Sequence, residues 1–370
     1  MKVRTVEAIP ISVPGDAGLR RDGTDAFEHV LVRVETTAGT VGWGEIAPMP
    51  SWPQGLTQDA CLGLVREVLA PTVEGSRLAA IDRVVADMED ALADVPFPIA
   101  GVDVALHDAL GRHLGLPVAD LLGGTTTPDG TISLQASIPP GSEQAVRSAA
   151  RDAAAADVRD VKVKVGADAL AADQTALETV VDALPGARIR VDANGAWSPA
   201  AAVPALRRLD DAAGGLVYVE QPVPPEDRRG LRRVREATGL PVVADEACFS
   251  PTDVAALAAA DAVDAVSVKV AKAGGLARAQ EAAVVGQAVG LAVVVGGMLE
   301  LGIGTAASAH LAAAAPAIRF PTGIFAHGAS TALLENDDRW SASGPTFAVP
   351  EDPGLGIRVD PTAVERHRVD

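Results

Sequence analysis

Five short stretches decide the fold of this chain: Val161-Lys162-Val163-Lys164-Val165, Arg190-Val191-Asp192, Tyr218-Val219-Glu220, Val243-Ala244-Asp245 and Val266-Ser267-Val268-Lys269. Each is an apolar run that carries or ends in a charged residue. The steps from Lys164 to Asp192, Glu220, Asp245 and Lys269 are 28, 28, 25 and 24 residues. Each step has room for one strand, a loop, a helix and a second loop, so the pattern predicts repeated βα units.

The same unit extends outward in both directions from these runs. From about Thr131 onward, alanine-rich segments such as 142–156 and 251–260 have the composition of helices between the strands. We expect strands near 132–137, 161–165, 188–192, 216–220, 242–245, 265–269, 293–296 and 317–320. Eight strands in this order predict a parallel barrel, in which charges at the carboxyl ends of the strands meet at one mouth.

The first part of the chain has a different pattern. Alternating apolar residues predict strands at 1–13, 29–34 and 39–44, and helical periodicity follows at 57–92 and 98–111. Strands followed by helices favour an α+β domain, with loops at Gly15 to Asp25 and Ala47 to Gln54. We therefore predict an α+β domain at 1–125, a barrel domain at 126–330, and a segment at 331–370 that returns to the first domain.

Composition and charge narrow the classes of partner. The net charge of −18 argues against nucleic acid and against an anionic membrane surface. No apolar segment is typical of a membrane span or a secretion signal, and two cysteines are too few for a disulfide framework. These features favour a cytoplasmic enzyme with a small-molecule substrate, and we expect it to be a homo-oligomer.

Three acidic residues, Asp192, Glu220 and Asp245, end consecutive predicted strands. Carboxylates that meet at one barrel mouth repel each other unless a cation lies among them. Oxygen ligands favour a hard ion, so the pattern predicts a site for Mg²⁺, with Mn²⁺ as an alternative. Two further residues, Asn194 and Glu246, follow ligands closely and are candidates to hold those ligands in position.

Lysine is rare in this chain and is concentrated near the same mouth. The five lysines are Lys2, Lys162, Lys164, Lys269 and Lys272, whereas arginine supplies the other basic residues. Lys162 and Lys164 project to the same side of one strand, so we expect repulsion between them to lower one pKa and to provide a base. Lys269 follows four units later, on the opposite side of the barrel. We expect Lys272 to lie in a loop.

A glycine-rich segment, Gly296-Gly297-Met298-Leu299-Glu300-Leu301-Gly302, follows the seventh predicted strand. It lacks the Gly-Lys-Ser/Thr of a nucleotide-binding loop. Backbone amides at the start of the next helix could bind a substrate carboxylate. Gly297, Met298 and Glu300 are therefore candidates for the substrate pocket, although Glu300 fits a helix cap equally well. We interpret His107, His113 and His310 as helix-packing or surface residues.

Together these motifs resemble the enolase superfamily, in its muconate lactonizing enzyme subgroup (the mandelate racemase/muconate lactonizing enzyme family). The resemblance rests on Lys162-x-Lys164, Asp192-x-Asn194, Glu220-Gln221-Pro222, Asp245-Glu246 and Lys269 in this order, and on Gly42-Trp43-Gly44-Glu45 in the first domain. It implies a modified TIM barrel, (β/α)7β, under an α+β capping domain. It also implies Mg²⁺ on Asp192, Glu220 and Asp245.

The resemblance also implies a reaction. Lys164 would be the base on one face of a small carboxylate substrate, Lys162 its neighbour that lowers its pKa, and Lys269 the acid, base or cation on the other face. Members of the family remove the proton alpha to a carboxylate, giving an enediolate. We expect an isomerase, either a muconate-type cycloisomerase or an N-acylamino-acid racemase or epimerase. An o-succinylbenzoate synthase-like enzyme or another dehydratase (a lyase), and a non-catalytic binding protein, are the alternatives.

Two sequence features bear on the choice among these reactions. The paired aspartates of dipeptide epimerases near the eighth strand are absent, and Ile318-Arg319-Phe320-Pro321-Thr322-Gly323 stands there. The segment Thr305-Ala306-Ala307-Ser308-Ala309-His310 resembles muconate cycloisomerases. No histidine ends the seventh strand, which argues against the mandelate racemase subgroup.

Overall fold

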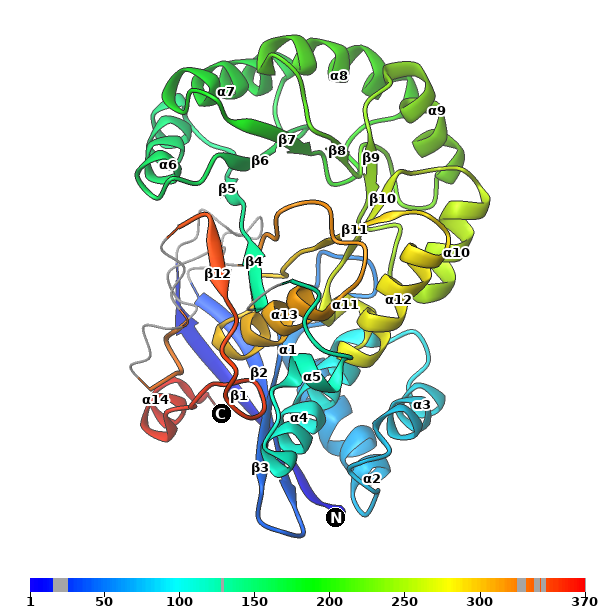
Figure 1. Cartoon of the computed structure of the whole chain (residues 1–370), viewed down its shortest axis with the longest axis vertical. Coiled ribbons are helices and arrows are strands. Elements are labelled where there is room, and N and C mark those ends of the chain that lie inside the picture. The colour runs from blue at the N-terminus through cyan, green and yellow to red at the C-terminus, as the bar shows by residue number, and fades with distance from the viewer. Residues whose placement is uncertain (16–25, 128–129, 325–330, 336–339, 341–343, 370) are drawn as a thin grey trace.

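The computed structural model describes residues 1–15, 26–127, 130–324, 331–335, 340 and 344–369. It has two parts, a sheet-and-helix domain at the bottom of Figure 1 and a curled sheet ringed by helices above it. These are the predicted α+β capping domain and modified (β/α)7β barrel. The predicted loop from Gly15 to Asp25 falls, except for Gly15, outside the described residues.

The capping domain contains a three-stranded antiparallel sheet in the order β1 (Val3–Pro14), β2 (Ala26–Thr36) and β3 (Val41–Ile46). Its helical elements are α1 (Gln58–Leu64), the π-helical turn η2 (Val65–Leu69), α2 (Ala70–Val73), α3 (Ile81–Ala91), α4 (Pro96–Leu114) and α5 (Val118–Leu121). Because side chains alternate along a strand, Val30 and Val32 pack in the core of the capping domain while Leu31 belongs to the barrel core. The sheet is therefore buried on both faces.

Helix α4 packs directly against β3. A Cβ atom at Gly44 would collide with the carbonyl oxygen of Gly101 in this helix, and one at Gly42 with that of Ala105. Only glycine allows this close approach of strand and helix, which explains both glycines of the Gly42-Trp43-Gly44-Glu45 motif. The approach also brings Glu45, at the end of the motif, toward the barrel.

Seven parallel strands form the curled sheet of the barrel, in the spatial order β11-β10-β9-β8-β7-β6-β5. The seven strands are β5 (Ala136–Ile138), β6 (Asp160–Lys164), β7 (Arg188–Asp192), β8 (Val219–Glu220), β9 (Val242–Ala244), β10 (Ala265–Val268) and β11 (Ala292–Val295). Strand β4 (Thr131–Ser133) precedes them in the chain and belongs to a separate two-stranded sheet. The helices between and after them are α6 (Glu143–Ala155), α7 (Leu170–Ala183), α8 (Pro199–Ala213), α9 (Arg228–Thr238), α10 (Pro251–Ala259), α11 (Val270–Ala273), α12 (Leu276–Ala288) and α13 (Gly302–Ala314).

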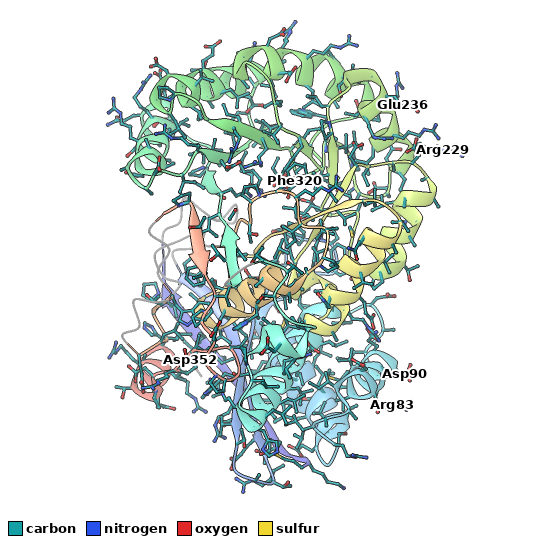
Figure 2. All side chains as sticks on the ribbon, viewed as in Figure 1. Arg83, Asp90, Arg229, Glu236, Phe320 and Asp352 are labelled. Atoms are coloured by element: carbon teal, nitrogen blue, oxygen red, sulfur yellow. The ribbon has the colours of Figure 1, made fainter. Side chains whose placement is uncertain are left out.

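The outer helices bury one face each. In α9, Leu231 and Val234 are fully buried against the sheet, while Arg229 and Glu236 extend from the outer side of the ring (Figure 2). Phe320, in contrast, lies inside the ring of strands. In the described residues, none of the helices has the length and apolar character needed to cross a membrane.

The eighth predicted strand, at 317–320, is wrong as a continuous strand. Ala317 has a φ of 61°, outside the extended region, and Pro321 lacks an N–H for a ladder. The segment instead makes single parallel bridges, from Ile318 to Val293 of β11, from Gly323 to Gly296 just after β11, and from Thr322 to Leu134. These bridges link the two ends of the curled sheet.

The last part of the chain touches both domains. Strand β12 (Thr346–Ala348) pairs antiparallel with β4, and helix α14 (Pro361–His367) lies beside β1. Between them, the Leu355 amide donates to Asp108 of α4 at 2.8 Å, and Arg112 of α4 donates to the Ile357 carbonyl oxygen at 2.8 Å. The segment therefore connects the barrel to the capping domain.

Candidate active site

Three buried carboxylates meet at the carboxyl ends of the barrel strands. Asp192 ends β7, Glu220 ends β8, and Asp245 follows β9 directly. The strand register pairs Asp192 with Glu220, so their side chains lie at the same level. One carboxylate oxygen from each of the three residues lies within 4.8 Å of the others. This is the cluster that the spacing of the sequence predicts.

The turns after these strands fix the cluster. Asn194 and Gln221, which follow two of the acids, have φ values of 43° and 37°, so the chain turns sharply after each strand. The Gln221 side-chain oxygen accepts hydrogen bonds from the amides of Asp245 at 3.0 Å and Ala247 at 3.1 Å. Gln221 therefore holds the backbone that carries Asp245.

Lysines contact the cluster from two separate strands. Lys164 of β6 donates to Asp192 at 2.6 Å, and Lys162 lies 3.1 and 3.2 Å from the two oxygens of Glu220. Lys269, just after β10, donates to Asp245 at 2.7 Å. Strands β7, β8 and β9 lie between β6 and β10. Lys164 and Lys269 therefore reach the acids from opposite sides.

The prediction that Lys272 lies in a loop is wrong. This residue lies in α11, which begins directly after Lys269, and it is almost fully buried. Its ammonium group donates to the Asp245 carboxylate at 2.7 Å and to the Asp245 carbonyl oxygen at 2.5 Å. The helix turns Lys272 back toward the same acid that Lys269 contacts. The rarity of lysine was the sequence signal that could have placed Lys272 among the candidate site residues.

Ion pairs and burial compete to set the pKa directions in the cluster. Burial alone would raise the pKa of Asp245, but the nearby Lys269 and Lys272 hold this pKa far below its usual range. Burial also lowers the pKa of Lys162, yet the Glu220 and Asp192 carboxylates outweigh it and raise this pKa well above its usual value. The expectation that repulsion between Lys162 and Lys164 lowers a lysine pKa therefore does not hold for Lys162. Burial raises the pKa of Glu220.

Asn194 links Lys164 to Glu246 through its side-chain amide. The Asn194 side-chain oxygen accepts from Lys164 at 3.0 Å, and its amide donates to Glu246 at 2.7 Å. Burial, together with the neighbouring Asp245 carboxylate, raises the pKa of Glu246 to about 7. These contacts orient Lys164 toward Asp192 and limit its freedom.

The capping domain contributes Trp52, which lies in the predicted loop from Ala47 to Gln54 and was not among the predicted site residues. The ammonium nitrogen of Lys269 lies 4.6 Å from the centre of the Trp52 ring, within cation–π range. On the barrel side, Gly296 makes room for Lys269, because a Cβ there would lie 2.9 Å from Cε of the lysine. Lys269 is therefore packed between an aromatic ring and a bare backbone.

The glycine-rich segment has a different role from the expected carboxylate site at the helix start. The amides of Leu301 and Gly304, at the start of α13, donate to the two oxygens of Glu45 at 2.6 and 2.8 Å. Glu45 comes from the capping domain and also pairs with His29 at 2.7 Å. The Glu45 side chain therefore accepts the hydrogen bonds of the two amides that were expected to bind a substrate carboxylate.

The three candidate pocket residues of this segment lie nearby. The Met298 amide donates to the Glu300 carboxylate at 2.5 Å, and both residues are buried. Met298 packs in the core of the capping domain. The Gly297 amide donates to the Gly323 carbonyl oxygen at 3.1 Å.

The carboxylate cluster fits a divalent cation. It offers three buried oxygen donors close enough to share one ion, and oxygen donors are what Mg²⁺ and Mn²⁺ bind. No cysteine or histidine belongs to it, which disfavours zinc. A capped barrel with three such acids between lysines is the arrangement of the enolase superfamily.

Comparisons with known proteins agree with this class. Residues 144–363 match the family model described as Enolase C-terminal domain-like, and residues 6–123 match the N-terminal domain of mandelate racemase / muconate lactonizing enzyme. The chain belongs to the mandelate racemase/muconate lactonizing enzyme family, and it is an enzyme of the enolase superfamily.

The individual relatives have two different activities, epimerisation and cycloisomerisation. The chain is 32% identical to the L-Ala-D/L-Glu epimerase of Bacillus subtilis, over 96% of this chain and 97% of the relative. It is 34% identical to muconate cycloisomerase 1 of Rhodococcus opacus, over 91% and 90%. Among solved structures, the muconate lactonizing enzyme from Pseudomonas putida superposes over 100% of both chains with a TM-score of 0.90 and 26% identity.

Proposed function

We propose that this protein is a divalent-metal-dependent isomerase that removes the proton alpha to the carboxylate of a small substrate. The observation that carries the proposal is the placement of Lys164 and Lys269 on opposite sides of the acidic cluster, each within 2.7 Å of one of its acids. A substrate carbon held between them would present one face to each amine.

Asp192, Glu220 and Asp245 would hold the metal, Mg²⁺ or alternatively Mn²⁺. When bound, the ion would supply two positive charges beside the substrate carboxylate and so lower the free energy of the anion that forms on proton loss. The ligand oxygens now paired with lysines would then be shared with the ion, and this would weaken the hold of Asp192 on Lys164.

The charges of the site suit such a substrate. Four lysines and four acids meet there: Lys162, Lys164, Lys269 and Lys272 with Asp192, Glu220, Asp245 and Glu246. The protein groups therefore nearly balance each other. A carboxylate that loses its alpha proton becomes a dianion, which needs an excess of positive charge to form in a buried site.

The lysines divide the proton transfers between them. Lys164 would take the alpha proton from one face, while Lys162, held by Glu220, would stay charged beside it. Lys269 would return a proton to the opposite face, or stay charged beside the developing anion. Trp52 would cover Lys269 and exclude water from that face.

Two isomerisations use these groups differently. Racemisation or epimerisation needs both lysines to move protons, and the paired contacts of Lys164 and Lys269 favour it. Cycloisomerisation needs one lysine as acid or base, and the similarity to muconate cycloisomerase 1 over 91% of the chain favours it. Dipeptide epimerisation is less favoured, because the segment from Ile318 to Gly323 lacks the paired aspartates that dipeptide epimerases carry near the eighth strand.

Proton exchange tests the proposal and separates the two isomerisations. The enzyme would be incubated with Mg²⁺ in D₂O with both enantiomers of each member of a panel of N-acylamino acids, and separately with cis,cis-muconate. We expect deuterium to enter the alpha position of at least one of these compounds or its product. For a racemase, Lys164→Ala would abolish exchange of one enantiomer and Lys269→Ala exchange of the other. Undiminished exchange by both variants would exclude the two-lysine mechanism.

A further inference from the structure

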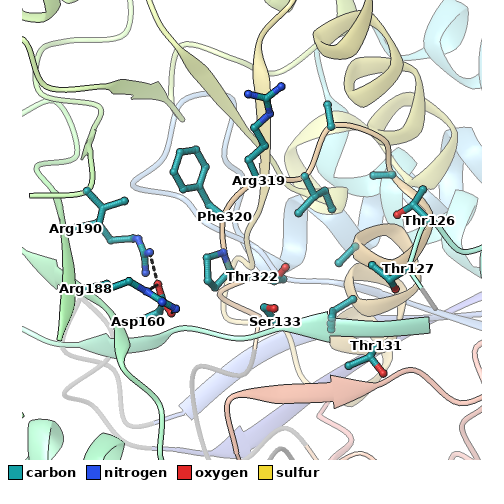
Figure 3. A pocket seen from close by; sticks show the side chains of 17 residues that line it. Thr126, Thr127, Thr131, Ser133, Asp160, Arg188, Arg190, Arg319, Phe320 and Thr322 are labelled. Atoms are coloured by element: carbon teal, nitrogen blue, oxygen red, sulfur yellow. Dashed lines mark hydrogen bonds and ion pairs between the residues drawn. The ribbon is translucent and has the colours of Figure 1, made fainter. Parts of the chain in front are cut away.

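A second cavity lies at the opposite mouth of the barrel, where the strands begin. It has a volume of about 680 Å³ and is lined by the first residues of β4, β6 and β7 and by the segment at 317–322 (Figure 3). Arg190 lies in its wall, two residues before the acid Asp192 on the same strand. None of the three acids or the active-site lysines is among the residues that line the cavity, so it is distinct from the candidate metal site and the proposed isomerisation does not use it.

One wall of the cavity is rich in guanidinium groups. Arg190 is 1% exposed; it donates to Asp160 at 2.6 Å and to Gln135 at 3.1 Å. Arg188 also pairs with Asp160, and Arg319 stands exposed on the other side of Phe320 in Figure 3. Two guanidinium groups thus share the Asp160 carboxylate, and Arg319 adds a third positive charge to the lining, so the cavity has an excess of positive charge.

Arg190 retains a donor that is not used. Within the described part of the chain, its buried Nε has no hydrogen-bond partner, and the same is true of the buried hydroxyl group of Tyr218, whose ring lies 5.3 Å from the Arg190 guanidinium. An unpaired buried donor on a cation is costly, because burial removes water without supplying an acceptor. An anion in the cavity would supply that acceptor.

The rest of the lining is apolar or carries hydroxyl groups. Phe320, Ile318 and Pro321 supply apolar surface, and Ser133 and Thr322 supply hydroxyl groups; in Figure 3, Phe320 lies next to Arg190. The volume lies in the range typical of small-molecule sites, which combine apolar walls with a few convergent polar groups. A simple inorganic anion would leave the apolar side without a contact.

We propose that this cavity binds a small organic carboxylate, with its charged group at Arg190 and its apolar body against Phe320. The unused Nε–H of this cation can donate a charge-assisted hydrogen bond to a carboxylate oxygen, which favours an anion over a cation or a neutral molecule. The site does not depend on the proposed isomerase function, since it shares none of the metal ligands or active-site lysines.

The test uses the full-length protein with Mg²⁺ and 4-fluorobenzoate as the probe, observed by ¹⁹F NMR titration. We expect saturable binding that Arg319→Gln and Arg188→Gln each weaken about tenfold, as the loss of one charged contact would. Both side chains are exposed, so these variants should fold. Arg190→Gln should abolish the binding, and Arg232→Gln, on the outer face of α9, is the matched control that should leave it unchanged.

Two further arms identify the site and the ligand class. Binding that persists in Asp245→Asn supports the second cavity, and binding lost in that variant alone would assign the probe to the active site and overturn the proposal. Equal binding by neutral 4-fluorobenzamide, or displacement of the probe by lower concentrations of inorganic phosphate than of benzoate, would overturn the ligand class. Absence of saturable binding, or equal binding by all arginine variants, would overturn the site itself.

Discussion

The two mouths of this barrel use the same strands but different cations. At the carboxyl ends, Lys162 and Lys164 of β6 face Asp192 and Glu220; at the amino ends, Arg190 of β7 faces Asp160. A lysine amine can lose its proton and act as a base, whereas a guanidinium stays charged. The comparison teaches that charge alone does not mark the chemical end of the barrel; the ability to titrate does.

The largest expected effect concerns the acids of the lysine-rich mouth. Asp245→Asn should lower turnover by roughly three orders of magnitude or more, because a catalytic metal contributes several kcal/mol of stabilisation. Turnover with saturating Mg²⁺ and circular dichroism are the measurements. The same change at exposed Asp261, Asp261→Asn, is the control and should be neutral. Full activity after exhaustive EDTA treatment would contradict the metal site.

A matched exchange of the two cations tests the comparison itself. Lys164→Arg keeps the charge but removes the base, so kcat should fall by about 10²–10⁴-fold with little change in the thermal midpoint. Arg190→Lys should leave kcat within a few-fold, but should lower the free energy of unfolding by about 1–3 kcal/mol, because one ammonium group cannot replace the contacts to both Gln135 and Asp160. A large loss of turnover in Arg190→Lys would break the distinction between the mouths.

A smaller effect is expected at the lid of the lysine-rich mouth. Trp52→Leu should lower kcat/KM by about tenfold, since a buried cation–π contact with Lys269 is worth roughly 1–2 kcal/mol. Trp52→Phe keeps an aromatic ring and should recover most of the loss. Steady-state kinetics of the two variants, with the substrate that the exchange panel identifies, make the comparison. Equal losses in both would mean that the ring face is not what acts on Lys269.

The last expected effect concerns pH at the arginine-rich mouth. Burial alone would raise the pKa of Asp160, but Arg188 and Arg190 hold this pKa below its usual value. Its ion pairs therefore stabilise the fold above about pH 4, and this contribution is lost as pH falls through the lowered pKa. Asp160→Asn should lower the free energy of unfolding by about 1–3 kcal/mol at neutral pH. Urea unfolding from about pH 5 to pH 2 should show that difference narrow; a constant difference would contradict it.

The sequence predicted the elements whose pattern is local. Regular spacing of Asp192, Glu220 and Asp245 was enough to bring three acids together, because parallel strands place their carboxyl ends at one mouth. The sequence also predicted the strands of the capping sheet, because their apolar residues recur at every second position. These features depend on periodicity, which can be counted along the chain.

Contacts between distant segments were not predictable in this way. Lys272 was misplaced because the helix that turns it back begins directly after Lys269, with no turn residue to mark it. The strand at 317–320 was overpredicted, since Ala317 adopts a positive φ that its sequence does not signal. Glu45 belonged to a recognised motif, but its partners in α13 lie 256 and 259 residues away.

The contact of Glu45 with α13 has a consequence for how the protein opens. Separating the two domains would break the charge-assisted hydrogen bonds of the buried Glu45 carboxylate to the Leu301 and Gly304 amides and leave it only His29, at a cost of roughly 3–5 kcal/mol. A hinge between the domains is therefore an expensive route for substrate entry, and β3 and α13 should behave as one cooperative unit. In native-state hydrogen exchange, the amides of these two elements should share one opening free energy and should lose protection together in Glu45→Gln.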